Sequence, residues 1–137
     1  MKNKICFLSF LMCIFVFAGC ENQKNLLGNW QIESLISDGV YQQIAVSDIS
    51  FLMEDNQFFV AGNSGVNRFN GVVKVQGNKI IIENLASTRM MGSEEEMEYE
   101  NLFLQTLTGV STFKIKDNKL KIINADKKLE LNFFRKN

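Results

Sequence analysis

The chain has 137 residues, of which 46% are hydrophobic, and its 15 basic residues balance 15 acidic ones. This length fits one domain with a single core, and the balanced charge lacks the clustered basic residues that nucleic-acid binding needs. The chain contains no His, which excludes His-based acid–base catalysis, Ser-His-Asp triads and His metal sites. We expect no enzyme, metal or cofactor.

The first 19 residues are typical of a secretory signal peptide. Lys2 and Lys4 precede an uncharged run over residues 5–17, and two small residues follow it. The run is shorter than the roughly 20 apolar residues that a membrane-spanning helix requires. We therefore assign residues 1–19 to a signal peptide, with an uncleaved anchor as the alternative.

Cys20 ends a segment, Phe17-Ala18-Gly19-Cys20, that resembles a bacterial lipobox, in which the chain is cut before the Cys and its thiol is acylated. An ordinary signal peptide with an incidental Cys is the alternative. The other two cysteines, Cys6 and Cys13, lie within the predicted signal, so no disulfide could form in the mature chain. We predict lipidation of Cys20.

Lipidation implies a location in the bacterial cell envelope, anchored to a membrane and facing the periplasm or the cell surface, because two or more acyl chains hold a protein stably. Residues 20–25 are polar and predict a short lipidated tether, which leaves residues 26–137 as the domain. Removing the signal takes away Lys2 and Lys4 and no acid, so the mature chain carries a charge of about minus two.

The domain opens with an expected strand over residues 28–36, with Trp30, Ile32 and Leu35 turned inward. Its Gly-x-Trp start also opens lipocalins. A weak strand is expected over residues 40–46. A hairpin should follow, in which Asp55-Asn56 joins strands over 49–54 and 57–61, and Ile49, Phe51 and Met53 share one face.

Residues 62–91 contain a Gly and Asn cluster and then two strands. The first strand alternates, with Phe69, Gly71, Val73 and Val75 on one face. Gly77-Asn78 then separates it from a second strand that begins at residue 79. A Gly-Asn pair between two such runs predicts a two-residue hairpin turn.

Residues 93–108 form the one expected helix. Ser93 and Glu96 have the spacing of a capping box, and Gly109 is a natural stop. The apolar residues with helical spacing are Phe103, Leu104, Leu107 and Val110. A metal or acid–base role for the Glu94–Glu96 run is possible on composition, but a solvated first turn matched to the helix dipole explains it better.

Three strands over residues 111–116, 119–124 and 128–133 should close the chain as a meander. The sequence therefore predicts a mainly β (α+β) fold, an antiparallel meander forming a curved sheet or partly closed barrel, with one helix inserted before the last three strands. Six lysines line the outer face of this last meander, either facing anionic head groups or, preferably, serving as solubilising edge charges: Lys114, Lys116, Lys119, Lys121, Lys127 and Lys128.

Four motifs in order give a family resemblance. They are Leu27 to Trp30, Gly65 to Gly71 (GVNRFNG), Ala86 to Met91 (ASTRMM) and Phe103 to Val110 (FLQTLTGV). Together they resemble the META domain, or HslJ-like, family over roughly residues 26 to 134. The family often has Cys at the positions of Val66 and Gly92. The joint loss of both here implies that these two residues lie near each other.

The polar residues within the family motifs are Asn67, Arg68, Thr88 and Arg89. The two Arg could present their guanidinium groups to a carboxylate or phosphate of a ligand. The preferred alternative is structural: Asn67 and Thr88 satisfy buried backbone groups where strands bend, while the two Arg lie across the sheet and pair with Asp or Glu.

Two function classes remain. The first is a non-catalytic, monomeric envelope lipoprotein whose META-like domain is a surface-acting scaffold or protein-interaction module, linked to envelope stress tolerance by the resemblance to the heat-shock member of the family. The second is a lipocalin-like carrier of a small apolar ligand, for which an interior cavity on the order of 300 Å³ would be needed. The state of the interior separates these two classes.

Overall fold

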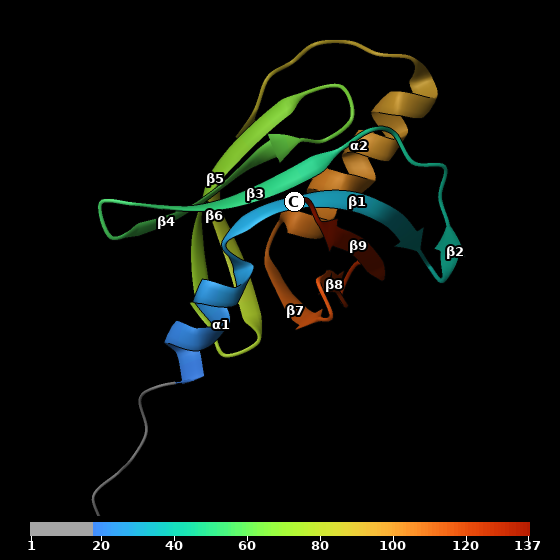
Figure 1. Cartoon of the computed structure of the whole chain (residues 1–137). Helices are drawn as coiled ribbons and strands as arrows, with labels where there is room; N and C mark the ends of the chain where they lie inside the picture. Colours follow the sequence, from blue (N-terminus) through green and yellow to red (C-terminus); the bar gives the residue numbers. More distant parts are fainter. Residues whose placement is uncertain (1–17) are drawn as a thin grey trace, which may run out of the picture.

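The computed structural model describes residues 18–137 (Figure 1). The hydrophobic run of the predicted signal peptide, with Cys6 and Cys13, lies outside this part of the chain. Within residues 18–137, neither helix has the length and hydrophobicity that a membrane crossing requires.

The described chain forms nine strands and two helices. In order they are α1 (Ala18–Leu26), β1 (Gly28–Ser37), β2 (Val40–Tyr41), β3 (Asp48–Glu54), β4 (Gln57–Asn63), β5 (Arg68–Gln76), β6 (Lys79–Ser87), α2 (Glu94–Leu107), β7 (Val110–Lys116), β8 (Lys119–Asn124) and β9 (Leu129–Arg135).

The predicted antiparallel meander is confirmed, and it closes fully into a barrel of eight strands. Each strand from β3 to β9 pairs with the next, and β1 pairs with both β3 and β9. The closing ladder runs from Trp30 opposite Arg135 to Ser37 opposite Leu129. The sequence could not distinguish a curved sheet from a closed barrel, because closure depends on this pairing of the first strand with the last.

β2 is a short ninth strand attached to the end of β1. It replaces the longer strand expected over residues 40–46. Two main-chain hydrogen bonds connect the residues after β2 to β1. The Gln42 N–H donates to the Leu35 carbonyl, and the Ile32 N–H donates to the Ser47 carbonyl. No ladder connects these two contacts, so the segment between them forms a loop.

The hairpin turns follow their predicted chemistry. Asp55 and Asn56 both have positive φ, 47° and 62°, which matches the right-handed twist of the flanking strands. Gly77 also has positive φ, at 61°. At the helix, Ser93 accepts a hydrogen bond from the Glu96 N–H and the Glu96 carboxylate accepts one from Ser93, so the predicted capping box is confirmed.

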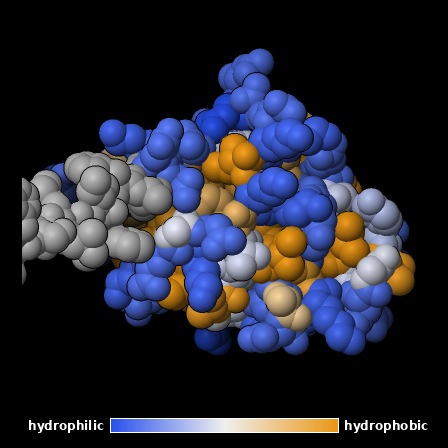
Figure 2. All heavy atoms as spheres, turned by 90° about the horizontal axis from the view of Figure 1, so that it is seen from below, coloured by the Kyte–Doolittle hydropathy of each residue, from blue (hydrophilic) through white to orange (hydrophobic). Residues whose placement is uncertain are grey.

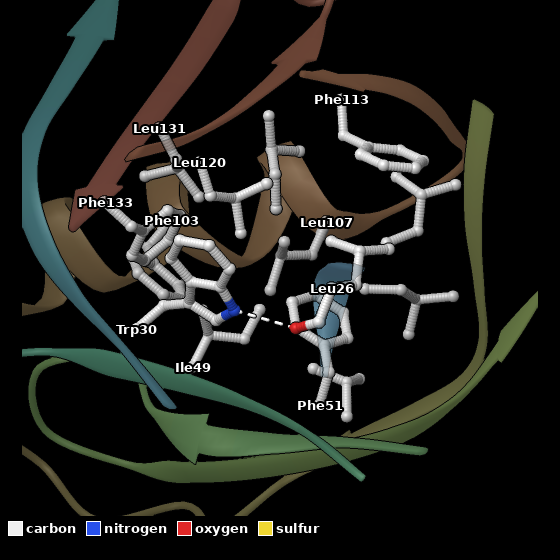
Figure 3. Packing of buried hydrophobic residues seen from close by; sticks show 14 of the residues in the cluster. Leu26, Trp30, Ile49, Phe51, Phe103, Leu107, Phe113, Leu120, Leu131 and Phe133 are labelled. Atoms are coloured by element: carbon white, nitrogen blue, oxygen red, sulfur yellow. Dashed lines mark hydrogen bonds between the residues drawn. The ribbon is translucent and has the colours of Figure 1, made fainter. Parts of the chain in front are cut away.

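Residues 20–25, predicted as a polar tether, belong to helix α1 instead. Glu21 in its first turn and Lys24 in its last turn complement the helix dipole. Its last residue, Leu26, is fully buried, and the Leu26 carbonyl accepts a hydrogen bond of 2.8 Å from the Trp30 indole (Figure 3). The end of α1 is therefore part of the domain core.

The two helices lie at opposite ends of the barrel. α1 lies beside the β5–β6 turn, where Asn22 donates to the Gly77 carbonyl. α2 follows the far end of β6 and packs against β7, β8 and β9 (Figure 1). Near its C-terminus, Asn124 donates to the Thr108 carbonyl. The barrel thus has an α1 end and an α2 end.

Buried side chains fill the interior of the barrel (Figure 3). Phe103 of α2 is fully buried at the centre, with its ring centroid 5.7 Å from that of Phe69 and 6.2 Å from that of Phe133. Trp30, Phe51 and Phe113 are buried as well, as the alternation of their strands predicts. Within residues 18–137, every core residue lies between Leu26 and Phe133, so a chain that begins at Glu21 keeps this core.

Two apolar residues assigned to inward faces are exposed. Met53 lies near the β3–β4 turn, where the strand extends past the packed interior, and Val110 starts β7 directly after the helix stop at Gly109. For Met53 the strand alternation is correct, but the barrel ends before the strand does. Val110 has the helical spacing of the apolar face of the predicted helix, but it belongs to β7 instead, where alternation with the buried Ser111 and Phe113 turns it outward.

Candidate functional site

The family motifs meet at the α2 end of the barrel. The β4–β5 loop carries Ser64 to Asn67, the segment after β6 carries Thr88 to Met90, and the first turns of α2 face both. The site is therefore built from two loops and one helix that are far apart in the sequence.

Asn67 connects these three segments. Its side chain is buried and uses every hydrogen-bonding position. Asn67 Oδ1 accepts from the Thr88 hydroxyl at 2.8 Å and from the Met90 N–H at 2.7 Å. Asn67 Nδ2 donates to the Met90 carbonyl at 3.1 Å and to Glu100 Oε1 at 2.6 Å. This pattern fits the predicted structural role, in which the amide satisfies backbone groups where the chain bends.

Glu100 of α2 is the second centre of the site. Its side chain is only 5% exposed. Glu100 Oε2 accepts hydrogen bonds from the Ser64 hydroxyl at 2.9 Å and from the N–H groups of Val66 and Asn67 at 3.1 and 2.7 Å. The carboxylate thus holds the β4–β5 loop through its main chain, and no cation takes part in these contacts.

The pKa of Glu100 reflects two opposing effects. Burial of the side chain raises the pKa, but the hydrogen bonds from Asn67, Ser64 and Val66 stabilise the charged form, and together they hold the pKa below its ordinary value of 4.5. The carboxylate is therefore ionised at neutral pH. A general base near neutral pH would need the opposite shift, so the network orders a loop and is not arranged for proton transfer.

Tyr99 lies beside this network. Its hydroxyl forms a hydrogen bond with the Ser47 hydroxyl, and burial raises the pKa of Tyr99 to about 12 despite that bond. Ser47 lies in the loop before β3, and a Cβ added to Gly65 would lie 3.1 Å from the Tyr99 ring. Tyr99 therefore fixes a third loop against α2.

Thr88 contacts the main chain of Arg68 twice, once through its hydroxyl and once through its main-chain N–H. Arg68 N–H donates to the Thr88 hydroxyl at 3.1 Å, and Thr88 N–H donates to the Arg68 carbonyl at 3.0 Å. This places Thr88 in the predicted structural role, where it continues the β5–β6 ladder past the last residue of β6.

Among the residues that the structure describes, the side chains of Arg68 and Arg89 do not form the ion pairs with Asp or Glu that the sequence favoured. Both side chains are exposed, and within residues 18–137 neither forms an ion pair with Asp or Glu. Arg68 instead lines a surface depression on the outside of the barrel with Asp48 and Ser50. Their predicted pairing with carboxylates is therefore wrong within the described part of the chain, and of the four residues only the buried Asn67 and the exposed Thr88 join the hydrogen-bond network around Glu100.

Val66 and Gly92 lie against each other, as the joint loss of the two family cysteines implies. A Cβ added to Gly92 would lie 2.7 Å from Val66 Cγ2. The β4–β5 loop and the segment before α2 therefore touch at this point through van der Waals contact.

Sequence reasoning missed Glu100, although its spacing holds a signal. Glu100 lies three residues before Phe103 and seven before Leu107, so it shares the buried face of the helix with them. The Glu94–Glu96 run, by contrast, is exposed as predicted. Within residues 18–137 no cluster of three potential metal ligands occurs.

Comparisons with known proteins agree with this architecture. The model of the META domain family matches residues 24–137. A protein from Burkholderia xenovorans, solved by NMR, is 20% identical, with a TM-score of 0.70 over 85% of this chain and 87% of that one. A crystal structure of a DUF4847 family protein from Bacteroides vulgatus is 15% identical, with a TM-score of 0.54 over 81% and 94% of the two chains. These TM-scores show a shared fold. Among curated proteins, none matches the chain.

Proposed function

Because the chain belongs to the META domain family, we propose that it is a non-catalytic lipoprotein domain, anchored through Cys20, that acts through its outer surface as a scaffold for a protein partner in the bacterial envelope. The proposal includes a role in envelope stress tolerance, which the family resemblance suggests.

The packed interior of the barrel is the observation that carries this proposal. Phe103 fills the centre from α2, and Trp30 and Leu26 occupy the opposite end. Buried apolar side chains of this size interlock at the density of a crystal and leave little space for a ligand. A surface role follows, and the same packing argues against the carrier alternative.

The loops at the α2 end supply the surface for a partner. Val46 and Met91 are the most exposed large apolar residues there, at 84% and 85%. Both belong to loops that the Asn67, Glu100 and Tyr99 contacts hold in place. Exposed apolar groups on rigid loops are typical of protein interaction sites, because little conformational entropy is lost on binding. This end also faces away from α1 and its lipid.

Lipidation is tested by metabolic labelling. Cells that express the full chain and are fed an alkyne-bearing fatty acid should yield a labelled protein in the membrane fraction, and Cys20→Ala should abolish both label and membrane association. A labelled Cys20→Ala variant, or an unlabelled wild type, would contradict the anchor.

The scaffold role is tested by site-specific photocrosslinking in the same cells. A photoreactive amino acid at Met91 or Val46 should give a discrete crosslinked product, whereas the same amino acid at Gln76, which is exposed at the α1 end, is the matched control. A deletion strain complemented with the wild type should resist envelope stress better than one complemented with a variant that no longer crosslinks. Equal amounts of crosslinked product at Met91, Val46 and Gln76 would contradict a specific interaction surface at the α2 end.

The carrier alternative has its own measurement. Native mass spectrometry of residues 21–137, purified from cells and then mixed with fatty acids, should show the mass of the polypeptide alone. A stoichiometric bound lipid would overturn the scaffold proposal in favour of the carrier.

A further inference from the structure

Four lysines form a square on the outer face of the β7–β8 hairpin. The ladder places Lys114 directly opposite Lys121 and Lys116 directly opposite Lys119, and all four side chains are exposed. Like charges directly opposite each other on antiparallel strands destabilise the sheet. The hairpin therefore carries two unfavourable cross-strand pairs that folding does not require.

Nearby carboxylates neutralise only part of this charge. Lys119 forms an ion pair with Glu33 at 2.9 Å and Lys121 one with Glu130 at 3.0 Å. In the described residues, Lys114 and Lys116 have no such pair. Asp117 at the turn is the third acid close to the square, so the four lysines outnumber the carboxylates around them.

Edge protection does not account for the lysines of β8. That strand is hydrogen-bonded on both sides, to β7 and to β9, along its length. Lys119 and Lys121 therefore have no open edge to protect. A surface depression of about 430 Å³ lies among the four side chains, which leaves room for an anionic group between them.

The square lies at the same end of the barrel as the proposed lipid anchor. The Arg135 N–H donates to the carbonyl of Asn118 in the β7–β8 turn. The Arg135 guanidinium donates to the carbonyls of Asn25 and Leu27, at the end of α1. One residue thus connects the tip of the lysine hairpin to the helix that carries Cys20. At 1.5 Å per residue, Cys20 lies about 8 Å along the helix from Asn25.

An exposed aromatic residue adjoins the square. Phe134 is register-paired with Lys119 and is 43% exposed on the outer face of β9. Seen from the α1 end, the surface shows apolar areas bordered by hydrophilic side chains (Figure 2). Lysines around an aromatic ring are the composition that favours the interface of an anionic membrane.

We propose that Lys114, Lys116, Lys119, Lys121 and Phe134 form a docking surface for anionic phospholipid head groups, which lays the β7–β8–β9 wall of the barrel against the membrane that holds the anchor. This inference rests on the proposed anchoring at Cys20. It adds the orientation of the domain, because contact along this wall leaves the loops at the α2 end free.

The test measures binding of residues 21–137, which retain the complete core and lack the lipid, to sedimented vesicles. Vesicles containing phosphatidylglycerol should bind the protein, vesicles of phosphatidylcholine alone should not, and added salt should weaken binding. Lys114→Gln with Lys116→Gln should reduce the partition coefficient about fivefold for each lysine. Lys127→Gln with Lys128→Gln removes the same charge at the α2 end and should change it much less.

A second readout locates the contact. Tryptophan fluorescence of Phe134→Trp should be quenched by brominated phosphatidylglycerol, whereas Met91→Trp at the α2 end should not be. The proposal would be overturned by any one of three results: an equal loss of vesicle binding in the two lysine double variants, equal binding to the two vesicle types, or equal quenching at both positions.

The outcomes separate this inference from the anchor. If Cys20 is not lipidated, the vesicle assay is unaffected, because the assayed chain has no lipid. If Cys20 is lipidated but the lysine square does not select anionic vesicles, the anchor stands and the docking surface is rejected.

Discussion

Asn67 and Glu100 bind each other twice. The Asn67 side-chain amide donates to one oxygen of the Glu100 carboxylate at 2.6 Å, and the Asn67 main-chain N–H donates to the other at 2.7 Å. The pair ties the family's GVNRFNG segment to α2, and its buried charge has no cationic partner. Most of the predictions about this site follow from that arrangement.

Glu100→Gln should destabilise the domain by about 1 to 3 kcal/mol at neutral pH, because an amide nitrogen would face the Asn67 amide donor. The folded pKa of Glu100 is lowered, so its stabilising effect is complete above the unfolded value near 4.5 and is lost as pH falls through the folded pKa. Urea unfolding from pH 7 to 3 should show the wild type and the variant converging below about pH 4.5. Glu98→Gln, exposed on the same helix, is the control, and a constant difference across this range would contradict the mechanism.

Asn67→Asp should also be most destabilising at neutral pH, but here because the variant itself gains stability as the pH falls. The new carboxylate would lie against Glu100 Oε1, and two carboxylates at that distance cannot both be ionised without a large penalty. We expect a loss of about 2 to 4 kcal/mol at pH 7, partly recovered as the pair takes up a proton in acid. Asn70→Asp introduces the same charge on the exposed face of β5 and should change stability by less than about 0.5 kcal/mol. Thermal melts at several pH values would measure both.

Phe69→Ala tests the filled interior. Phe69 is buried against Phe103, so truncation should leave a cavity and cost about 3 to 5 kcal/mol. Leu52→Ala, at a half-exposed position on β3, should cost less than about 1 kcal/mol. Chemical denaturation measures both. A loss well below 1 kcal/mol for Phe69→Ala would indicate an interior that is not tightly packed.

Val66→Cys with Gly92→Cys should restore a covalent link between the two loops. The Cβ atoms would lie at most about 4.2 Å apart, because one C–C bond of about 1.5 Å separates Val66 Cγ2 from its Cβ, and this separation suits a disulfide. Oxidation should stabilise the domain by up to about 3 to 4 kcal/mol relative to the reduced form. Thiol titration and melting with and without reductant provide the measurement. Val66→Cys alone is the control, and free thiols after oxidation would refute the geometry.

Lys114→Glu should stabilise the barrel while weakening membrane binding. The substitution replaces a like-charge pair with an opposite-charge pair across from Lys121, worth about 0.2 to 1 kcal/mol. Vesicle binding should fall further than with Lys114→Gln, because a charge is reversed. If the stability and the vesicle binding of Lys114→Glu both rose, the like-charge pair of Lys114 and Lys121 would not contribute to lipid binding.

The strands could be predicted because their alternation is local. Residues such as Phe69 and Val73 reveal a buried face without any knowledge of partners, and the turns at Asp55-Asn56 and Gly77-Asn78 have residues suited to positive φ. Helix α2 was predictable for the same reason, since Ser93 and Glu96 specify its start locally.

Features that depend on tertiary contacts were not predictable. The polar composition of α1 indicated a tether, and only the buried Leu26 and its bond with Trp30 explain why that segment is ordered as part of the domain. Glu100 looked like one more acid in a charged helix, since its partners come from a loop 33 residues earlier. The sequence also favoured ion pairs for Arg68 and Arg89, but composition alone could not show whether a carboxylate lies within reach of either guanidinium group.

The pairing of β1 with β9 constrains the order in which the barrel folds. β1 pairs with β3 on one side, but its partner on the other side is the last strand, from Leu129 to Arg135. Until those residues emerge, one edge of β1 lacks its hydrogen-bonding partner and the barrel stays open beside Trp30. Contacts of such long sequence separation also form slowly. A chain that emerges from its N-terminus onward therefore cannot close the barrel before its last strand is available. Under the proposed anchoring at Cys20, barrel closure would therefore be completed in the envelope.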